Sequence, residues 1–186
     1  RTTPTALSTA REQLVGASVG DYALFAGGNT GSAYSSVVDA YSANLIRTTP
    51  TALSTARDRL AGASVGDYAL FAGGYTGSAV VDAYDTDLIR TTPTALSTGR
   101  SGLAGASVGD YALFAGGWTG SASAVVDAYT TNLTRSTPTA LSAARYWLAG
   151  ASVGDYALFA GGEIGTTIYT PAVDAYSNFV SSTYLP

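Results

Sequence analysis

Aspartates recur through this sequence at almost constant spacing, and their carboxylates are the side chains best suited to chemistry. One set follows a glycine at intervals of 46, 43 and 45 residues: Asp21, Asp67, Asp110 and Asp155. Carboxylates that converged at one end of a channel would offer oxygen ligands to Ca²⁺. A Gly-Asp pair between two apolar runs is also typical of a tight hairpin turn, in which Asp bonds its own backbone. We interpret the set as turn residues, predict no metal and no cofactor, and keep a channel-end cation as the alternative.

A second set of aspartates lies between apolar neighbours in the repeated Val-Asp-Ala-Tyr: Asp39, Asp82, Asp127 and Asp174. These positions are expected to be partly buried, and a buried carboxylate needs a partner. Every repeat also supplies an arginine at an equivalent place: Arg11, Arg57, Arg100 and Arg145. The pattern predicts a structural Arg–Asp pair in each repeat.

The residue types that support most enzymatic chemistry are missing. The sequence has no His and no Cys, and its nine basic residues are all Arg. Acid–base catalysis near neutral pH and Ser-His-Asp nucleophiles depend on His, and zinc and copper sites depend on His or Cys. We therefore predict that the protein is not an enzyme. A carbohydrate-active enzyme with paired carboxylates is the alternative that these residues leave open.

Charge and apolar patterning limit the classes of partner to be expected. The formal net charge is −4, charged residues make up only 12%, and no basic cluster occurs. Nucleic acids and anionic membranes both attract clustered Lys and Arg, so neither is expected as a partner. The longest apolar run is Tyr-Ala-Leu-Phe-Ala, far below the ~20 residues of a membrane-spanning helix. The Ser-, Thr- and Gly-rich composition without Cys or Lys suits an extracellular or particle-surface module, although the localisation stays unassigned.

A thirteen-residue block, GASVGDYALFAGG, occurs four times without change. The copies are Gly16–Gly28, Gly62–Gly74, Gly105–Gly117 and Gly150–Gly162. Close packing on both sides of a strand explains low tolerance to change, and complete identity indicates recent duplication or design of one unit. We interpret residues 1–186 as one domain that consists of four repeats, at about residues 1–46, 47–89, 90–134 and 135–186.

The second repeat shows what each unit should form. The alternating pattern and turn residues predict strands at 59–66, 67–74, 80–84 and 88–92, with Gly66-Asp67 as the first turn. Pro93 then blocks further ladder pairing. Four short antiparallel strands in each of several consecutive repeats are typical of an all-β fold, the β-propeller.

The repeats resemble the kelch family. The matching glycine pairs are Gly27-Gly28, Gly73-Gly74, Gly116-Gly117 and Gly161-Gly162. The matching tyrosines are Tyr41, Tyr84, Tyr129 and Tyr176, and the matching arginines are those of the predicted Arg–Asp pairs. The resemblance implies a propeller of four-stranded blades and, most often, a role in protein interaction. Kelch repeats usually carry Trp on the fourth strand, where this chain has Leu45, Leu88, Leu133 and Phe179.

Two closures of the ring are compatible with four kelch-like blades. One chain closes on itself as a four-bladed ring, or two chains join as half-rings into an eight-bladed homodimer. A head-to-tail interface closes only when the rotation per unit divides a full turn, and that angle is not encoded in a local pattern.

The residues that flank the invariant block differ between repeats. In an antiparallel blade, the segment before strand one and the link after strand two emerge on the same side, so these positions should converge on one face of the ring. Loops on a rigid scaffold commonly carry binding, and the composition is like that of an antibody paratope. The predicted partner-binding residues are Glu12, Gln13, Asn29, Asp58, Arg59, Tyr75, Trp118, Tyr146, Trp147, Glu163 and Ile164.

We therefore predict a non-enzymatic module that binds a protein or a glycan through this face. One alternative is a symmetric, self-assembling structural or designed scaffold without an external ligand, in which the flanking positions have simply drifted. Exposed tryptophan without a role is unusual, so Trp118 and Trp147 favour a binding face.

Overall fold

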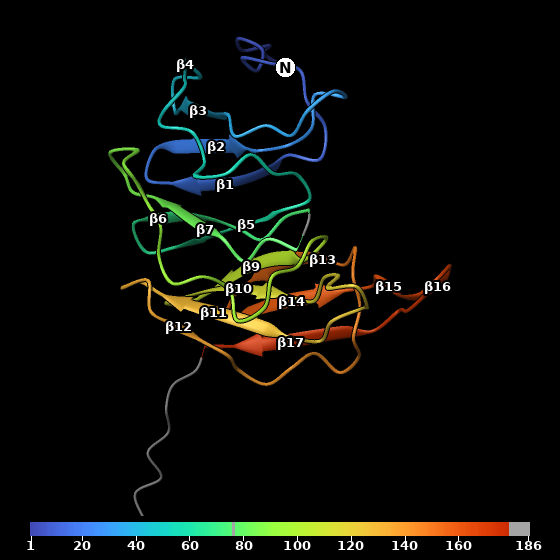
Figure 1. Ribbon diagram of the computed structural model, residues 1–186. Helices are drawn as coiled ribbons and strands as arrows, with labels where there is room; N and C mark the ends of the chain where they lie inside the picture. The colour runs from blue at the N-terminus through green and yellow to red at the C-terminus, as the bar shows by residue number, and fades with distance from the viewer. Residues whose placement is uncertain (76, 179–186) are drawn as a thin grey trace, which may run out of the picture.

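Each repeat folds into a small antiparallel sheet. The structure, a computed structural model, describes residues 1–75 and 77–178. In the second repeat the strands pair in chain order (Figure 1), and they are β5 (Ala61–Val65), β6 (Tyr68–Ala72), β7 (Val81–Tyr84) and β8 (Arg90–Thr91). We call this group sheet 2. Sheet 1 comprises β1 (Val15–Val19), β2 (Tyr22–Ala26), β3 (Val38–Ser42) and β4 (Arg47–Thr48). Sheet 3 comprises β9 (Ala104–Val108), β10 (Tyr111–Ala115), β11 (Val126–Thr130) and β12 (Arg135–Ser136).

The fourth repeat departs from this plan. Sheet 4 has three strands among the described residues: β13 (Ala149–Val153), β14 (Tyr156–Ala160) and β17 (Val173–Ser177). The longer link between β14 and β17 forms its own hairpin, β15 (Glu163–Gly165) with β16 (Ile168–Tyr169), which the sequence analysis did not predict. The fourth strand of this repeat, in which the sequence analysis placed Phe179, falls outside the described residues.

The first turn of each sheet is the predicted Gly-Asp pair. In sheet 2, Val65 pairs with Tyr68 across it, and Gly66 has a φ of +49°, which glycine adopts with little strain. The predicted fourth strand is too long, because β8 contains only Arg90 and Thr91. Leu88 instead belongs to a turn, with a φ of +62° and its N–H donating to the carbonyl oxygen of Asp85.

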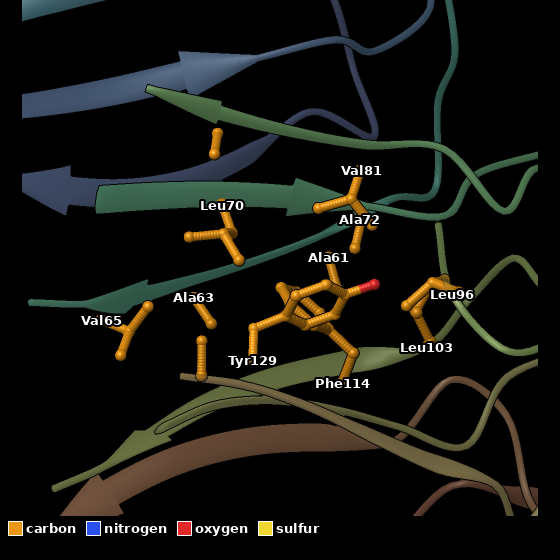
Figure 2. Close-up of a cluster of buried hydrophobic side chains, with 12 residues drawn as sticks. Ala61, Ala63, Val65, Leu70, Ala72, Val81, Leu96, Leu103, Phe114 and Tyr129 are labelled. Atoms are coloured by element: carbon orange, nitrogen blue, oxygen red, sulfur yellow. The ribbon is translucent and has the colours of Figure 1, made fainter. Parts of the chain in front are cut away.

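The two faces of each sheet are apolar but different. The valine face of sheet 2 carries Val65, Leu70 and Val81, and the phenylalanine face of sheet 3 carries Ala112, Phe114 and Tyr129. These two faces pack directly together, and Figure 2 shows Phe114 and Tyr129 among the side chains of sheet 2. The same pairing joins sheet 1 to sheet 2 and sheet 3 to sheet 4. The core is therefore a series of three equivalent interfaces.

The first strands of neighbouring sheets approach each other closely. A Cβ atom on Gly62 would lie 2.6 Å from the carbonyl oxygen of Gly16, and Gly105 and Gly150 stand in the same relation to the glycine one repeat earlier. Beside them, the Ser64 hydroxyl donates to the carbonyl oxygen of Ser18 (2.6 Å) and accepts from its N–H (3.2 Å). Close backbone approach thus explains why these positions of the invariant block are small.

The sheets follow one another in chain order as an open array. Figure 1 shows sheet 1 at the top, sheet 2 below it, and sheets 3 and 4 overlapping in the lower part of the view. In sheet 4, Val153 and Val173 are 61% and 60% exposed, whereas their equivalents in the other three sheets are buried. The fold is all-β with about four repeated sheets packed together, and the described residues do not close a ring. No helix long and apolar enough to cross a membrane occurs in the described part of the chain.

Candidate functional site

The two variable stretches of each repeat lie side by side at one end of the first hairpin. Backbone bridges join Glu12 to Asn29 and Ser101 to Trp118. Tyr146 forms the same bridge with Glu163, and the N–H of Tyr75 donates to the carbonyl oxygen of Asp58 (2.9 Å). The antiparallel pairing that creates the hairpin continues past the strand ends and holds these positions together.

A backbone ladder then links the variable positions of successive repeats. Gln13, Arg59, Gly102 and Trp147 all have left-handed φ values, between +54° and +60°. This conformation is uncommon for residues other than glycine. The N–H of Arg59 donates to the carbonyl oxygen of Gln13, that of Gly102 to Arg59, and that of Trp147 to Gly102, over 3.2, 2.9 and 2.8 Å. The ladder gives the variable positions of all four repeats a fixed order.

Side chains on and beside this ladder form a continuous series of contacts, which we call the aromatic row. In order, its members are Tyr34, Tyr75, Arg59, Trp147, Tyr146 and Trp118. The centroids of Tyr34 and Tyr75 are 5.5 Å apart. The Arg59 guanidinium carbon lies 4.9 Å from the Tyr75 centroid and 5.4 Å from the Trp147 ring, within cation–π range of both.

The fourth repeat completes the row. Tyr146 packs 6.4 Å from Trp147 and 4.9 Å from Trp118, which comes from the third repeat. Gly102 lies under the Trp147 ring, and a Cβ atom there would be 3.1 Å from ring carbon Cε3. The absence of a side chain at Gly102 therefore lets the indole lie against the backbone.

Two shallow hollows open beside the row and share three residues: Tyr75, Ser101 and Trp118. One has a volume of about 210 Å³ and is also lined by Arg59, Tyr146 and Trp147. The other, of about 320 Å³, adds Gly77, Thr119 and Gly120. Ser101 is buried, and no hydrogen bond of its hydroxyl occurs among the described residues. Each hollow thus combines aromatic walls with hydrogen-bonding groups.

The predicted face residues differ in accessibility. Trp118 and Trp147 are 41% and 50% exposed, and Tyr75, Glu12, Gln13 and Ile164 are also exposed. Asn29, Arg59, Tyr146 and Glu163 are half-buried. Asp58 was predicted to contact a partner, but its side chain is 2% exposed, with Oδ2 3.9 Å from Nε of Arg59. Asp58 therefore supports the face from within.

The predicted partner-binding residues did not include Tyr34 or Ser101, although Ser101 lies in one of the variable stretches that were expected to converge. Tyr34 lies in the link after the first invariant block and reaches the ring of the next repeat. Its only sequence signal was an aromatic residue in a variable loop. Ser101 follows the repeated Arg100, at a position where the other repeats carry larger side chains.

The surroundings raise the pKa of two phenols of the row, those of Tyr146 and Tyr34. Desolvation raises the pKa of Tyr146, and the nearby Glu163 carboxylate raises it further. Desolvation also raises the pKa of Tyr34, with additional effects from Tyr75 and Asp58. Both phenols are therefore protonated at neutral pH, and that of Tyr146 is hydrogen-bonded to the Glu163 carboxylate.

The recurrent aspartates are structural or exposed. Arg11, Arg57 and Arg100 lie 2.8 Å from Asp39, Asp82 and Asp127, and Arg145 lies 2.7 Å from Asp174, which confirms the predicted pairs. The turn aspartates Asp21, Asp67, Asp110 and Asp155 are exposed. Within the described ranges, no group of three or more acidic side chains is placed to hold a metal ion.

Comparison with known proteins does not assign this site. No protein-family model matches the chain, and a search of curated proteins finds no similar sequence.

Proposed function

We propose that this chain is a non-enzymatic binding module whose variable face binds a protein partner. The observation that carries the proposal is the aromatic row, which joins side chains from all four repeats across the ends of their hairpins. The scaffold is proposed to be a β-propeller of the kelch type, with the four sheets as its blades. The sheet pairing within each repeat and the repeated face-to-face packing support that finer description.

The composition of the row supports a protein-binding hot spot. Energetically dominant interface residues are enriched in Trp, Tyr and Arg, and the row consists only of these types. Arg59 is held between two rings, so little side-chain freedom is lost on binding. Rigid aromatic anchors of this kind also dominate antibody paratopes.

The shape of the face favours a protein over a small molecule. Small-molecule sites usually enclose about 300–1,000 Å³. One hollow, of about 210 Å³, is smaller than this, and the other, of about 320 Å³, is at the lower end of the range; the two lie side by side. A protruding loop with one or two apolar side chains would fill them while its backbone bonds to Ser101 or Tyr146. A glycan is the other partner class that adjacent aromatic hollows accommodate.

The test compares the wild-type protein with a Trp118→Ala/Trp147→Ala double variant. A phage-displayed peptide library is selected on the wild type, and a glycan array is probed in parallel. Removing two hot-spot residues should weaken a selected peptide by about 30-fold or more. Ile89→Ala serves as the control, because Ile89 is exposed but lies in the turn before β8, outside the row.

Peptides that bind the wild type and the control but not the double variant would support the proposal. Equal binding by the double variant would overturn it, and melting temperatures within a few degrees of each other would show that the fold is intact. Glycans bound through the same residues would assign the face to that class instead. If neither library yields a ligand, the self-assembling scaffold becomes the better description, and the exposed end faces of the array favour it as the second candidate.

A further inference from the structure

The two ends of the array expose complementary surfaces. At one end is the valine face of sheet 4, where Val153, Tyr156 and Val173 are exposed. At the other is the phenylalanine face of sheet 1, where Ala23 is exposed and Phe25 and Tyr41 are half-buried. Inside the array, each of these faces covers the other kind. We propose that a second copy of this chain packs head to tail, with its sheet 1 against sheet 4 of the first.

The exposed face of sheet 1 retains the shape of the internal interface. An apolar groove of about 640 Å³ lies on it, lined by residues that include Leu7, Leu14, Phe25 and Tyr41. The equivalents of Leu7 and Leu14 in the second repeat are Leu53 and Leu60, and both are buried between sheets 1 and 2. The groove therefore occupies the place where the internal interfaces hold the valine face of the preceding sheet.

Backbone hydrogen bonding leaves matching groups at the two ends. At each internal interface, a serine hydroxyl of the later sheet bonds the backbone of the serine one repeat earlier, as Ser107 does with Ser64. Within the described residues, the Ser18 hydroxyl has no such partner, and no hydroxyl reaches the backbone carbonyl of Ser152. Seating Ser18 of a second copy beside Ser152 would repeat the internal geometry.

Two further backbone contacts follow the same rule. The ladder of variable positions ends at Trp147, whose carbonyl oxygen accepts no bond in the described part of the chain, and it begins at Gln13, whose N–H donates none. Gly28 donates to the carbonyl oxygen of Arg57 (3.0 Å), and Gly117 donates to that of Arg145 (2.8 Å). The equivalent donor in the fourth repeat is Gly162, and the equivalent acceptor in the first repeat is Arg11. Donors and acceptors at the two ends thus correspond in kind and position.

The space around the first-strand glycines also indicates that a second copy packs against sheet 1. Gly62 is confined by the Gly16 carbonyl oxygen, whereas the nearest atom to a Cβ on Gly16 is a Phe25 ring carbon at 3.5 Å, an ordinary contact. Space remains in front of Gly16 for a neighbouring strand. A head-to-tail contact either closes into a ring or continues as an open series. Two chains closed by two such contacts would form the eight-bladed ring.

The experiment uses one substitution on each end face and measures mass by sedimentation equilibrium. Val153→Glu places a charge on the valine face, and Ala23→Glu places one on the phenylalanine face. Both positions are exposed in the single chain, while their equivalents are buried at internal interfaces. Ile89→Glu introduces the same charge at a 59% exposed position away from both faces. Thermal melting checks that each variant folds, and Tyr156→Glu and Gly16→Val replace either end-face variant that does not.

We expect the wild type and Ile89→Glu to associate and each end-face variant to be monomeric. An equimolar mixture of the two end-face variants should form a 1:1 pair, because each supplies the face that the other lacks. A wild-type mass equal to two chains would indicate a closed ring, whereas a series of larger masses would indicate an open array. Both assemblies use the proposed contact between sheet 1 and sheet 4. A monomeric wild type, end-face variants that still associate, or a mixture that stays monomeric would overturn the proposal.

Discussion

Nη1 of Arg57 lies 2.8 Å from Oδ2 of Asp82, and both side chains are buried. The other Asp82 oxygen accepts hydrogen bonds from Arg90 (2.9 Å) and from the N–H of Ser54 (3.1 Å). Arg57 also donates to the carbonyl oxygen of Phe71 on β6 (3.0 Å). The pair therefore ties the segment before sheet 2 to the second and third strands of that sheet, and it recurs in each repeat.

Replacing Asp82 with Ala should destabilise the fold strongly. Removing one partner of a buried ion pair leaves the other charge uncompensated and typically costs about 3–5 kcal/mol. Urea denaturation measures the free energy of unfolding. Asp87→Ala is the matched control, because Asp87 is exposed and its carboxylate makes no hydrogen bond or ion pair within the described residues; it should change stability by less than about 0.5 kcal/mol. Equal stabilities of the two variants would contradict the structural role of the pair.

Acid should destabilise the protein through the same pairs. Burial alone would raise the pKa of Asp39, but hydrogen bonds from Arg11 and Ser8 outweigh it and lower the pKa overall. Burial would also raise the pKa of Asp174, but hydrogen bonds from Ser142 and Arg145 outweigh it and lower the pKa overall. A carboxylate whose pKa is lower in the folded state contributes stability above its unfolded pKa, and this is lost as the pH falls through the folded value.

The melting temperature should therefore be nearly constant just above pH 5 and fall below about pH 4. Thermal denaturation followed by circular dichroism between pH 2 and pH 7 measures this profile. The Asp39→Asn variant should show a smaller decrease across the acid range, since one of the linked groups is gone. A melting temperature that rises as the pH falls below 4 would contradict the assignment.

Gly62→Ala should destabilise the interface between sheets 1 and 2. The new Cβ would lie 2.6 Å from the Gly16 carbonyl oxygen, so the two first strands would have to separate. Overpacking of this kind typically costs about 1–3 kcal/mol.

Gly16→Ala is the matched control in the same sequence context, because its Cβ would make only ordinary contacts within the chain. It should be neutral or slightly stabilising in unfolding measurements at low protein concentration, since glycine is unfavourable in a strand. If both variants lost the same free energy of unfolding, the close approach of the two first strands would not be the cause of the loss.

Much of the arrangement within one repeat could be predicted from the residues. The Gly66-Asp67 turn and the alternation in Tyr68–Ala72 specify a hairpin through local backbone geometry, and recurrence of Asp82 with Arg57 indicated their pairing. The two variable stretches were expected to meet for the same reason, since antiparallel strands place their ends together. The left-handed Leu88 and the hairpin β15–β16 were missed, because turn conformations at non-glycine residues and short irregular pairings leave little trace in a pattern.

The sequence by itself determined the repeating sheet, because its period, its first turn and its ion pair depend on contacts within one repeat. Only the tertiary structure decided that Arg59 lies between the rings of Tyr75 and Trp147, that Tyr34 joins the row and that Asp58 is buried. It also decided that sheets 1 and 4 keep one face uncovered. These features depend on the distance and angle between neighbouring sheets, which are set by the combined packing of many side chains and not by any local pattern.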